Sequence, residues 1–324
     1  MKAVVLKGYG GPEVLDFDEV DDPTIGPEEI LISVRAAGIN RADLLQREGL
    51  YPPPDPKPQH EILGLECAGT VEALGERVTL FRKGQAVAAL VSGGAYAEKV
   101  SVHERMAFAV PENLSWAEAA AIPEAFLTAY DALRDKAAVG AGSRVLIHAA
   151  AGGVGSVAVQ LAHWMGALVI ATVGTEEKAK WVQSLGADQS VVYRSQPFLE
   201  AAEAKGGVHA VLDFVGQAYW DDNISALVPG GVLVIIGTLS GPMASVNLGR
   251  LLQKRLTVRG TALRTRPLEA RMALMQEFSQ RVLPAISQGV LRPLLDQTLA
   301  FDEVAEAHRH LAAEQARGKT ILLW

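Results

Sequence analysis

The spacing of hydrophobic residues follows two different patterns along this chain of 324 residues. Over about the first 120 residues, short segments alternate apolar and polar positions, as at Ile30, Ile32 and Val34, and Gly and Pro separate the segments. Such alternation predicts strands with one buried face, interrupted by a short helix over Arg41 to Glu48. We therefore expect this part of the chain to be mostly β-structure.

The pattern changes near residue 115. Ser115 and Glu118 have the spacing of a capping box, and the helix that they begin is interrupted at Pro123 and restarts toward Arg134. Strands then alternate with helical segments, which is typical of a parallel sheet covered by helices on both faces. The predicted strands span 144–148, 168–173, about 190–193, 209–214 and 231–237.

The last part of the chain departs from this alternation. After an edge strand from Leu256 to Thr261, the pattern predicts a long helix over 268–287, a β segment, a helix from Phe301 and a last strand, Lys319 to Leu323. The last strand has no βαβ partner nearby, so we expect the chain to return to the β-rich domain and leave a cleft between two lobes. The predicted domains are 1–122 with 263–324, and a Rossmann-type domain over 123–262.

Composition narrows the class of protein. The formal net charge is -7 and no stripe of Lys and Arg is present, so nucleic-acid binding is disfavoured. No signal peptide or window of about 18 apolar residues is found, so we expect a soluble, cytoplasmic protein without a membrane span. The single cysteine, Cys67, excludes an internal disulfide and any zinc site with two thiolates. Its apolar surroundings predict a core position.

A candidate phosphate-binding turn lies in the run LIHAAAGGVGSVAVQLA, between a strand and a helix. Ala150, Gly152 and Gly155 occupy the three glycine positions of the dinucleotide fingerprint. The small residues here, with Gly153 and Val154 between them, let backbone N–H groups approach a pyrophosphate at the positive end of the helix. The alternative is a βα turn that binds no nucleotide, but the flanking strand and helix favour the dinucleotide.

The end of the second strand of this domain indicates which dinucleotide is bound. An NAD enzyme places an Asp about 20 residues past the glycine turn, on the ribose hydroxyls, but this chain reads VGTEEK there. Gly174 and Thr175 leave room for a 2′-phosphate, Lys178 offers a counter-charge and Tyr193 a hydroxyl donor. These residues favour NADPH. The alternative places Lys178 on a solvated helix face beside two glutamates.

Two further features of this domain point to a ligand and to a partner. Gly237, Thr238 and Leu239 follow a strand, and ligands of open α/β sheets bind beyond the carboxyl ends of strands, so we expect them to line a nicotinamide pocket. An ordinary strand-end turn is the alternative. The edge strand over 256–261 invites pairing with a second copy, which predicts a homodimer.

Six motifs span nearly the whole chain: GYGGPEVL, AAGINRADLLQREGLYPPP, ILGLECAGTVEALG, AAAIPEAFLTAYDAL, AAAGGVG and GKTILL. Together they resemble the zinc-free quinone oxidoreductase branch of the medium-chain dehydrogenase/reductase superfamily, most closely its tumour-suppressor-inducible members. The resemblance implies an α/β protein with a GroES-like β-rich catalytic domain, a Rossmann doubly wound cofactor domain and commonly a homodimer. It also implies that Lys178 and Tyr193 bind NADPH and that Lys319 reaches the cofactor, although Lys319 could otherwise be an exposed terminal residue.

The resemblance bears on zinc as well. Where zinc alcohol dehydrogenases carry a catalytic Cys and a Gly-His-Glu motif, this chain has Asn40 and the triplet Gly64-Leu65-Glu66. An amide and a leucine cannot supply the thiolate and imidazole that zinc prefers. His308 and His310 are two residues apart and face different sides of a helix. We therefore expect no metal site.

Without a metal, hydride transfer needs an acceptor that is already electrophilic, such as a quinone or a conjugated carbonyl. The candidate catalytic residues are Asn40, Asp43, Tyr51 and Thr128. The resemblance places Asn40 and Thr128 near the nicotinamide, where Asn40 could donate to a developing oxyanion. Tyr51 could contact the quinone or pack against Pro52 to Pro54, and Asp43 could instead cap the turn or orient Asn40.

These residues predict an NADPH-dependent quinone reductase. Two alternatives stay open at this point: a reductase of conjugated enals or enones, and a non-catalytic NADPH-binding sensor or structural protein. The presence of Asn40, Thr128 and Lys178 argues against the non-catalytic alternative.

Overall fold

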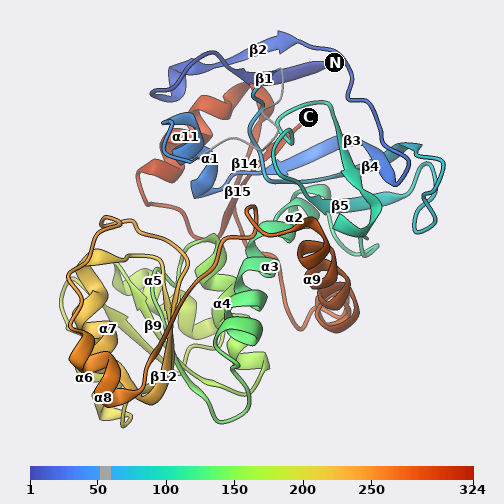
Figure 1. The fold of residues 1–324 in the computed structure, drawn as a ribbon. Helices are drawn as coiled ribbons and strands as arrows, with labels where there is room; N and C mark the ends of the chain where they lie inside the picture. Colours follow the sequence, from blue (N-terminus) through green and yellow to red (C-terminus); the bar gives the residue numbers. More distant parts are fainter. Residues whose placement is uncertain (52–59) are drawn as a thin grey trace. The chain divides into compact units, whose positions relative to one another are not determined.

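A computed structural model describes residues 1–51 and 60–324 of the chain, which form two compact units (Figure 1). The first unit contains Met1–Leu127 and Arg266–Trp324, and the second unit contains Thr128–Thr265. The chain enters the second unit within helix α3 (Pro123–Tyr130). The sequence predicts domain boundaries between residues 122 and 123 and between residues 262 and 263. These boundaries remain a prediction.

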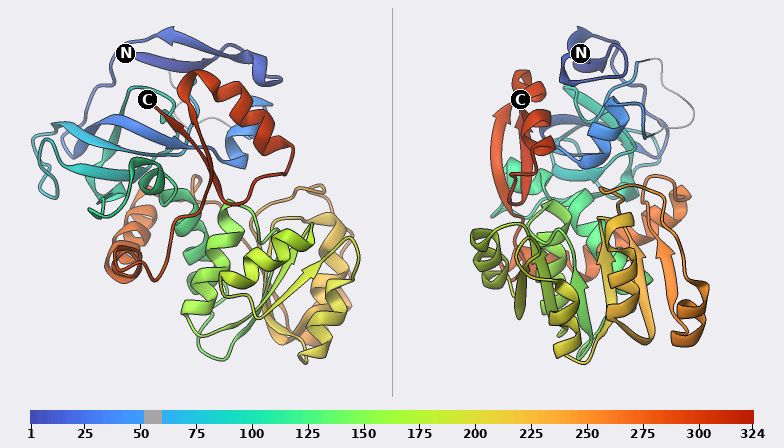
Figure 2. Two further views of the ribbon diagram at one scale, coloured as in Figure 1. Left: turned by 180° about the vertical axis from the view of Figure 1, so that it is seen from behind. Right: turned by 90° about the vertical axis from the view of Figure 1, so that its left-hand side faces the viewer.

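The second unit is a six-stranded, fully parallel sheet with helices on both faces (Figure 2). This arrangement confirms the Rossmann-type prediction. The strand order is β10-β9-β8-β11-β12-β13, so the segment predicted at the edge does lie there. The strands are β8 (Arg144–Ile147), β9 (Leu168–Val173), β10 (Gln189–Val192), β11 (Val208–Asp213), β12 (Leu227–Ile235) and β13 (Thr257–Gly260).

The strand register explains why this sheet is stable. It aligns one row of fully buried apolar side chains across four strands, and helices α6 and α7 cover that row. Each such side chain stabilises the fold by about 1.5–3 kcal/mol relative to an exposed one. The row is Ile170, Leu146, Val211 and Leu233. The helices are α4 (Gly153–Trp164), α5 (Glu176–Ser184), α6 (Phe198–Ala204), α7 (Trp220–Ala226) and α8 (Leu248–Lys254), with a π-helix, η3 (Asp131–Lys136), after α3.

The first unit is mostly β-structure, as predicted. A seven-stranded sheet has the order β14-β15-β3-β4-β5-β7, with β6 also paired to β3, and β1 pairs with β2 separately. Ile30, Ile32 and Val34 are buried on β3, which confirms the face expected from the alternation. The strands are β1 (Lys2–Leu6), β2 (Leu15–Glu19), β3 (Glu29–Gly38), β4 (Glu66–Leu74), β5 (Ala86–Leu90), β6 (Lys99–His103), β7 (Ala107–Ala109), β14 (Leu295–Ala300) and β15 (Lys319–Leu323).

Short helices cover this sheet and connect its strands. Ser115 and Glu118 form the predicted capping box at the start of α2. The helix expected over 268–287 is two helices, because Pro284 has no N–H to donate and its ring excludes the carbonyl one turn earlier. The helices are α1 (Arg41–Arg47), α2 (Trp116–Ala120), α9 (Leu268–Arg281), α10 (Leu283–Ser287) and α11 (Val304–Ala312).

The last strand returns to the first unit, as expected, but the reason given from the sequence is wrong. β15 pairs antiparallel with β3 and also parallel with β14, and α11 lies between β14 and β15 in the chain. A βαβ partner therefore does precede the last strand. The sequence predicts the β segment that is β14 but not its parallel pairing with β15, because the mixed pattern of an outer strand does not show which strand it pairs with. Within the described part of the chain, no helix combines the length and apolarity that a membrane crossing requires.

Candidate active site

The first unit holds a polar centre where β3 ends and α1 begins. Asn40 is the N-cap of α1, and its backbone N–H donates to the carboxylate of Asp43 at 2.8 Å. Asp43 also accepts hydrogen bonds from the backbone N–H of Gly64 at 3.2 Å and the hydroxyl of Tyr96 at 3.1 Å. Its side chain is fully buried, so this geometry supports a structural role for Asp43 in fixing the turn.

A row of buried polar groups continues from Asp43 to α11. Burial raises the pKa of Asp43 to about 6, and its hydrogen bonds and the charge of Lys319 oppose that rise. The Tyr96 hydroxyl lies 3.4 Å from Nε2 of His308, whose Nδ1 lies 3.3 Å from Nη1 of Arg47. Since arginine only donates, this hydrogen-bond pattern assigns the His308 proton to Nε2.

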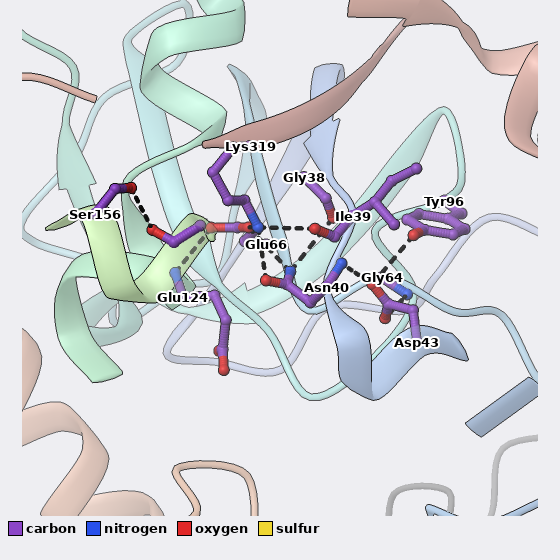
Figure 3. Close-up of polar contacts among 11 residues, drawn as sticks. Gly38, Ile39, Asn40, Asp43, Gly64, Glu66, Tyr96, Glu124, Ser156 and Lys319 are labelled. Atoms are coloured by element: carbon purple, nitrogen blue, oxygen red, sulfur yellow. Dashed lines mark hydrogen bonds and ion pairs between the residues drawn. The ribbon is translucent and has the colours of Figure 1, made fainter. Parts of the chain in front are cut away.

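The Asn40 side chain belongs to a second cluster, with Glu66 of β4 and Lys319 of β15 (Figure 3). Its amide oxygen accepts from Lys319 Nζ at 2.6 Å, and its amide nitrogen donates to Glu66 Oε1 at 2.9 Å. Lys319 and Glu66 form an ion pair of 2.5 Å. The alternative of an exposed terminal lysine is wrong, since Lys319 is only 4% exposed. Its contact with a cofactor stays a prediction.

Glu66 and Cys67 are neighbours on β4 with different surroundings. Both are fully buried, and burial raises the pKa of the Cys67 thiol to about 12, which confirms its expected core position. Glu66 was not among the site residues expected from the sequence. A single acidic residue in the apolar run ILGLECAGTV is the signal that would have found it, because a buried carboxylate needs a partner.

The other two catalytic candidates lie elsewhere in the chain. Thr128 is on α3, belongs to the second unit and is 8% exposed. Tyr51 is half-buried, and its backbone N–H donates to the Leu45 carbonyl at 3.2 Å. The alternative contact of Tyr51 with Pro52 to Pro54 lies outside the described residues. Catalytic roles for Tyr51 and Thr128 stay predictions.

The candidate phosphate-binding turn follows β8 in the second unit. Gly152 is the N-cap of α4, so the first unpaired backbone N–H groups of that helix, at Gly153 and Val154, lie at the turn. The Ala150 N–H donates to the Thr172 carbonyl at 3.0 Å, which holds the turn beside β9. Gly155 packs so closely that a Cβ there would lie 2.3 Å from the carbonyl oxygen of residue 149. This turn fits a pyrophosphate.

The residues expected to select the 2′-phosphate lie near the carboxyl ends of β9 and β10. The last residues of β9 and β10 pair in parallel register, so Gly174 and Tyr193 come next to each other. A Cβ on Gly174 would lie 3.2 Å from the Tyr193 hydroxyl. Thr175 caps α5 by accepting from the Lys178 N–H at 3.2 Å, which places Lys178 in the first helical turn. This grouping supports the NADPH interpretation.

The loop after β12 lies against the end of β11. The Gly237 N–H donates to the Asp213 carbonyl and the Leu239 N–H to the Phe214 carbonyl, both at 3.2 Å. Thr238 and Leu239 are exposed. β11 and β8 are neighbouring parallel strands. The loop after β12 and the glycine turn after β8 therefore both lie at the carboxyl ends of the strands of this sheet. Its contact with nicotinamide stays a prediction.

A buried hydrogen-bond network beside the glycine turn was not predicted from the sequence. His148 follows β8, and its Nδ1 lies 2.9 Å from Thr172 Oγ1 while its Nε2 lies 2.7 Å from Asn223 Oδ1. The rings of Phe198 and Tyr219 lie 4.7 and 4.8 Å from its ring. Burial lowers the pKa of His148 to about 4, so the imidazole is neutral. A lone histidine at the end of an apolar strand is the signal for it.

Comparison with known proteins identifies the family. A profile described as alcohol dehydrogenase GroES-like domain matches residues 26–112, and one described as zinc-binding dehydrogenase matches residues 153–280. A quinone oxidoreductase of Pseudomonas aeruginosa is 36% identical to this chain, and the match covers 99% of both proteins. The chain belongs to the medium-chain dehydrogenase/reductase superfamily.

Solved structures support the fold of this medium-chain dehydrogenase/reductase. An Escherichia coli quinone oxidoreductase complexed with NADPH matches with a TM-score of 0.91 and 32% identity, over 100% of both chains. An NAD-dependent alcohol dehydrogenase matches with a TM-score of 0.89 and 32% identity, also over 100% of both chains. The predicted combination of a GroES-like domain and a Rossmann-type domain is confirmed.

The donor set of this medium-chain dehydrogenase/reductase does not fit zinc, although one matching profile names that metal. Leu65 offers no donor atom, and the oxygens of Asn40 and Glu66 already accept from the Lys319 ammonium. A second cation there would meet that positive charge. Within residues 1–51 and 60–324, no three His, Cys, Asp or Glu side chains are grouped to hold a metal ion. The cluster instead holds the ammonium group of the Lys319 side chain.

Proposed function

We propose that this chain is an NADPH-dependent, zinc-independent oxidoreductase that transfers hydride to a quinone. The observation that carries the proposal is the cluster of Asn40, Glu66 and Lys319, which offers hydrogen bonds where a metal-dependent relative would need metal ligands. Relatives named quinone oxidoreductase support the acceptor class. Membership in the tumour-suppressor-inducible branch belongs to the same proposal and rests on the sequence motifs.

The cofactor part of the proposal rests on the second unit. Gly174 leaves space beside the Tyr193 hydroxyl, and Lys178 supplies a positive charge in the turn that follows. A 2′-phosphate needs both space and a counter-charge, whereas a ribose diol prefers an acidic acceptor at this strand end. The relative solved with NADPH supports this choice. The NAD-dependent relative makes a direct comparison of the two cofactors necessary.

The residues of the chain account for the acceptor chemistry. Bound NADPH supplies a hydride, and a quinone needs no Lewis acid because its reduced anion spreads charge over the ring. We infer that the Asn40 amide donates to the acceptor oxygen as negative charge develops, which stabilises the transition state more than the ground state. One proton from solvent completes the hydroquinone. Tyr51 and Thr128 are proposed to contact the quinone and the nicotinamide, respectively.

Steady-state oxidation of NADPH and of NADH with matched p-quinones and enones tests the proposal. We expect fast oxidation with NADPH and a quinone, and slower oxidation with enones or with NADH. Asn40→Ala should lower kcat by about 100-fold, because one donor to the developing oxyanion is lost. Asn113→Ala, on an exposed loop, is the matched control and should keep the wild-type rate. Lys178→Ala should weaken the binding of NADPH but not that of NADH.

Each other outcome would support a different function. Turnover with enones alone would replace quinone reduction with reduction of a conjugated double bond. Tight NADPH binding without turnover on any acceptor would favour a sensor or structural protein. Tighter binding of NADH than NADPH, with no effect of Lys178→Ala, would contradict the cofactor assignment.

We also propose that the chain forms a homodimer through the far edge of the second unit. Edge strand β13 is open on one side, and six exposed large apolar side chains lie between residues 239 and 258. Exposed apolar side chains concentrated in one part of a chain are typical of an interface. The side chains are Leu239, Met243, Val246, Leu248, Leu252 and Val258.

Light scattering during size exclusion measures this association. We expect twice the chain mass of 34.4 kDa for the wild type. Leu252→Glu should shift the protein toward the monomer, because Leu252 is 80% exposed on α8 and a charge there would be buried by a second copy. Val290→Glu, at an exposed site of the first unit, is the control. A wild-type monomer at micromolar concentration would contradict the proposal.

A further inference from the structure

The ammonium group of Lys319 is enclosed by oxygen atoms of the first unit. It donates to the Ile39 carbonyl at 2.9 Å and to Asn40 Oδ1 at 2.6 Å, and it lies 2.5 Å from Glu66 Oε1. Three acceptors match the three N–H bonds of an ammonium group. Lysine is almost never this deeply buried unless it is paired, so this contact set is a built site for one positive charge.

Glu66 completes the site and neutralises it. Its Oε1 also accepts from Asn40 Nδ2 at 2.9 Å, and its Oε2 accepts from the Glu124 backbone N–H at 2.8 Å. Gly38 makes room for the carboxylate, since a Cβ at Gly38 would lie 2.2 Å from Glu66 Oε1. Every charge in the cluster therefore has a partner within the first unit.

This ion pair fixes which way the Asn40 amide faces (Figure 3). A flipped amide would turn its NH2 group toward the ammonium and its oxygen toward the carboxylate, which is unfavourable on both sides. In the observed orientation one amide hydrogen goes to Glu66. The amide nitrogen also donates to the Gly38 carbonyl at 3.5 Å, a long and weak contact that a ligand oxygen would replace.

We propose that Lys319 and Glu66 are positioning residues, and that their ion pair replaces a catalytic metal by presetting the Asn40 amide as the donor to the acceptor oxygen. The inference rests on the proposed function and adds the reason why Asn40 works there. The pair has no net charge, so it contributes the orientation of the amide rather than an added charge at the acceptor oxygen. The ligand class is a carbonyl oxygen that gains negative charge, as in a quinone.

The double variant K319M/E66Q is the decisive test, because it removes both buried charges together and avoids leaving either one unpaired. We expect kcat with a p-quinone to fall by about 100-fold, as for a misplaced donor, while the quinone KM stays within about twofold. This inference assigns the Lys319 ammonium to its three oxygen partners in place of the predicted cofactor contact, so the NADPH Kd should also stay within about twofold. K99M/E72Q removes another ion pair of the same unit and should keep the wild-type kcat. Added ethylammonium should partly restore the kcat of K319A.

Two outcomes would overturn the inference. One is a wild-type kcat in K319M/E66Q. The other is a raised NADPH Kd with unchanged kcat, which would make Lys319 a cofactor ligand instead. If the double variant does not fold, the rescue of K319A by ethylammonium tests the inference instead. Partial restoration of kcat supports it, and no restoration contradicts it.

A spectroscopic measurement separates this inference from the proposed function. In 15N-labelled protein, the Asn40 side-chain amide, assigned by its loss in N40D, should show two well-separated hydrogen signals. In K319M/E66Q we expect these signals to converge and exchange faster with water, and unchanged signals would contradict the inference. If the wild type turns over no quinone, the proposed function fails while this measurement still decides the role of the ion pair.

Discussion

Gly155→Ala is expected to weaken NADPH binding by at least about 100-fold. The new Cβ would lie 2.3 Å from the Ala149 carbonyl oxygen and 2.8 Å from the Ala150 Cα, and both are backbone atoms that cannot move aside alone. The first turn of α4 must therefore separate from the end of β8. Each hydrogen bond from the turn to a charged phosphate contributes about 1.5–3 kcal/mol, so losing two gives this change. A fluorescence titration with NADPH measures it.

Two further glycines make the experiment quantitative. A Cβ on Gly140 meets no atom within 4 Å, so Gly140→Ala should bind NADPH as the wild type does. A Cβ on Gly152 would lie 3.3 Å from the Ala149 carbonyl oxygen, so Gly152→Ala should have an intermediate Kd. Circular dichroism separates loss of binding from loss of the fold. Wild-type affinity in Gly155→Ala would show that this turn does not hold the phosphates.

Acidification from pH 8 to pH 5 should lower the thermal midpoint of unfolding, because each unit buries a neutral histidine. Burial lowers the pKa of His148 to about 4 and of His308 to about 3, from 6.5 in the unfolded chain. Below pH 6.5 the unfolded state takes up protons that the folded state does not, so the stability present above that pH is lost. At pH 5 each histidine lowers the free energy of unfolding by about 2 kcal/mol, which lowers the thermal midpoint by about 4–8 °C.

The variants His148→Gln and His308→Gln isolate this effect. In each, the fall between pH 8 and pH 5 should be about 4–8 °C smaller than in the wild type, whatever the midpoint at pH 8. The exposed His60→Gln is the control. Asp43 opposes the trend, because its pKa of about 6 lets the folded state gain a proton before the unfolded state does. Calorimetry showing the same fall in both variants and the wild type would refute the prediction.

Local patterns explain how much of the second unit could be predicted. The turn from Ala150 to Gly155 combines a strand, small residues and a helix in one continuous segment, so its conformation is encoded by neighbours in the sequence. Gly174 and Tyr193 are separated by only 19 positions and follow adjacent strands of a βαβ unit, whose parallel register brings them together. Sequence reasoning therefore identified these positions as a group.

The cluster around Asn40 could not be predicted, because its contacts join distant parts of the chain. Lys319 Nζ contacts an asparagine that lies 279 positions earlier, and a charged residue at the start of a strand is usually solvated. Its burial follows from the pairing of β15 with β3, which no periodicity in the sequence shows. The same holds for His148 and Asn223, which are 75 positions apart. Sequence periodicity indicates which faces are buried but does not pair distant polar groups.

The placement of Lys319 on β15 also sets an order of events during synthesis. The second unit is one continuous segment, so we expect it to fold before synthesis of the first unit is complete. The cluster of Asn40, Glu66 and Lys319 has two members early in the chain and is completed only when residue 319 has been synthesised. Until then Glu66 has no counter-charge, and closing so long a loop is a late, slow step. We therefore expect the nascent chain to complete the parallel sheet of the second unit before it completes the cluster of Asn40, Glu66 and Lys319.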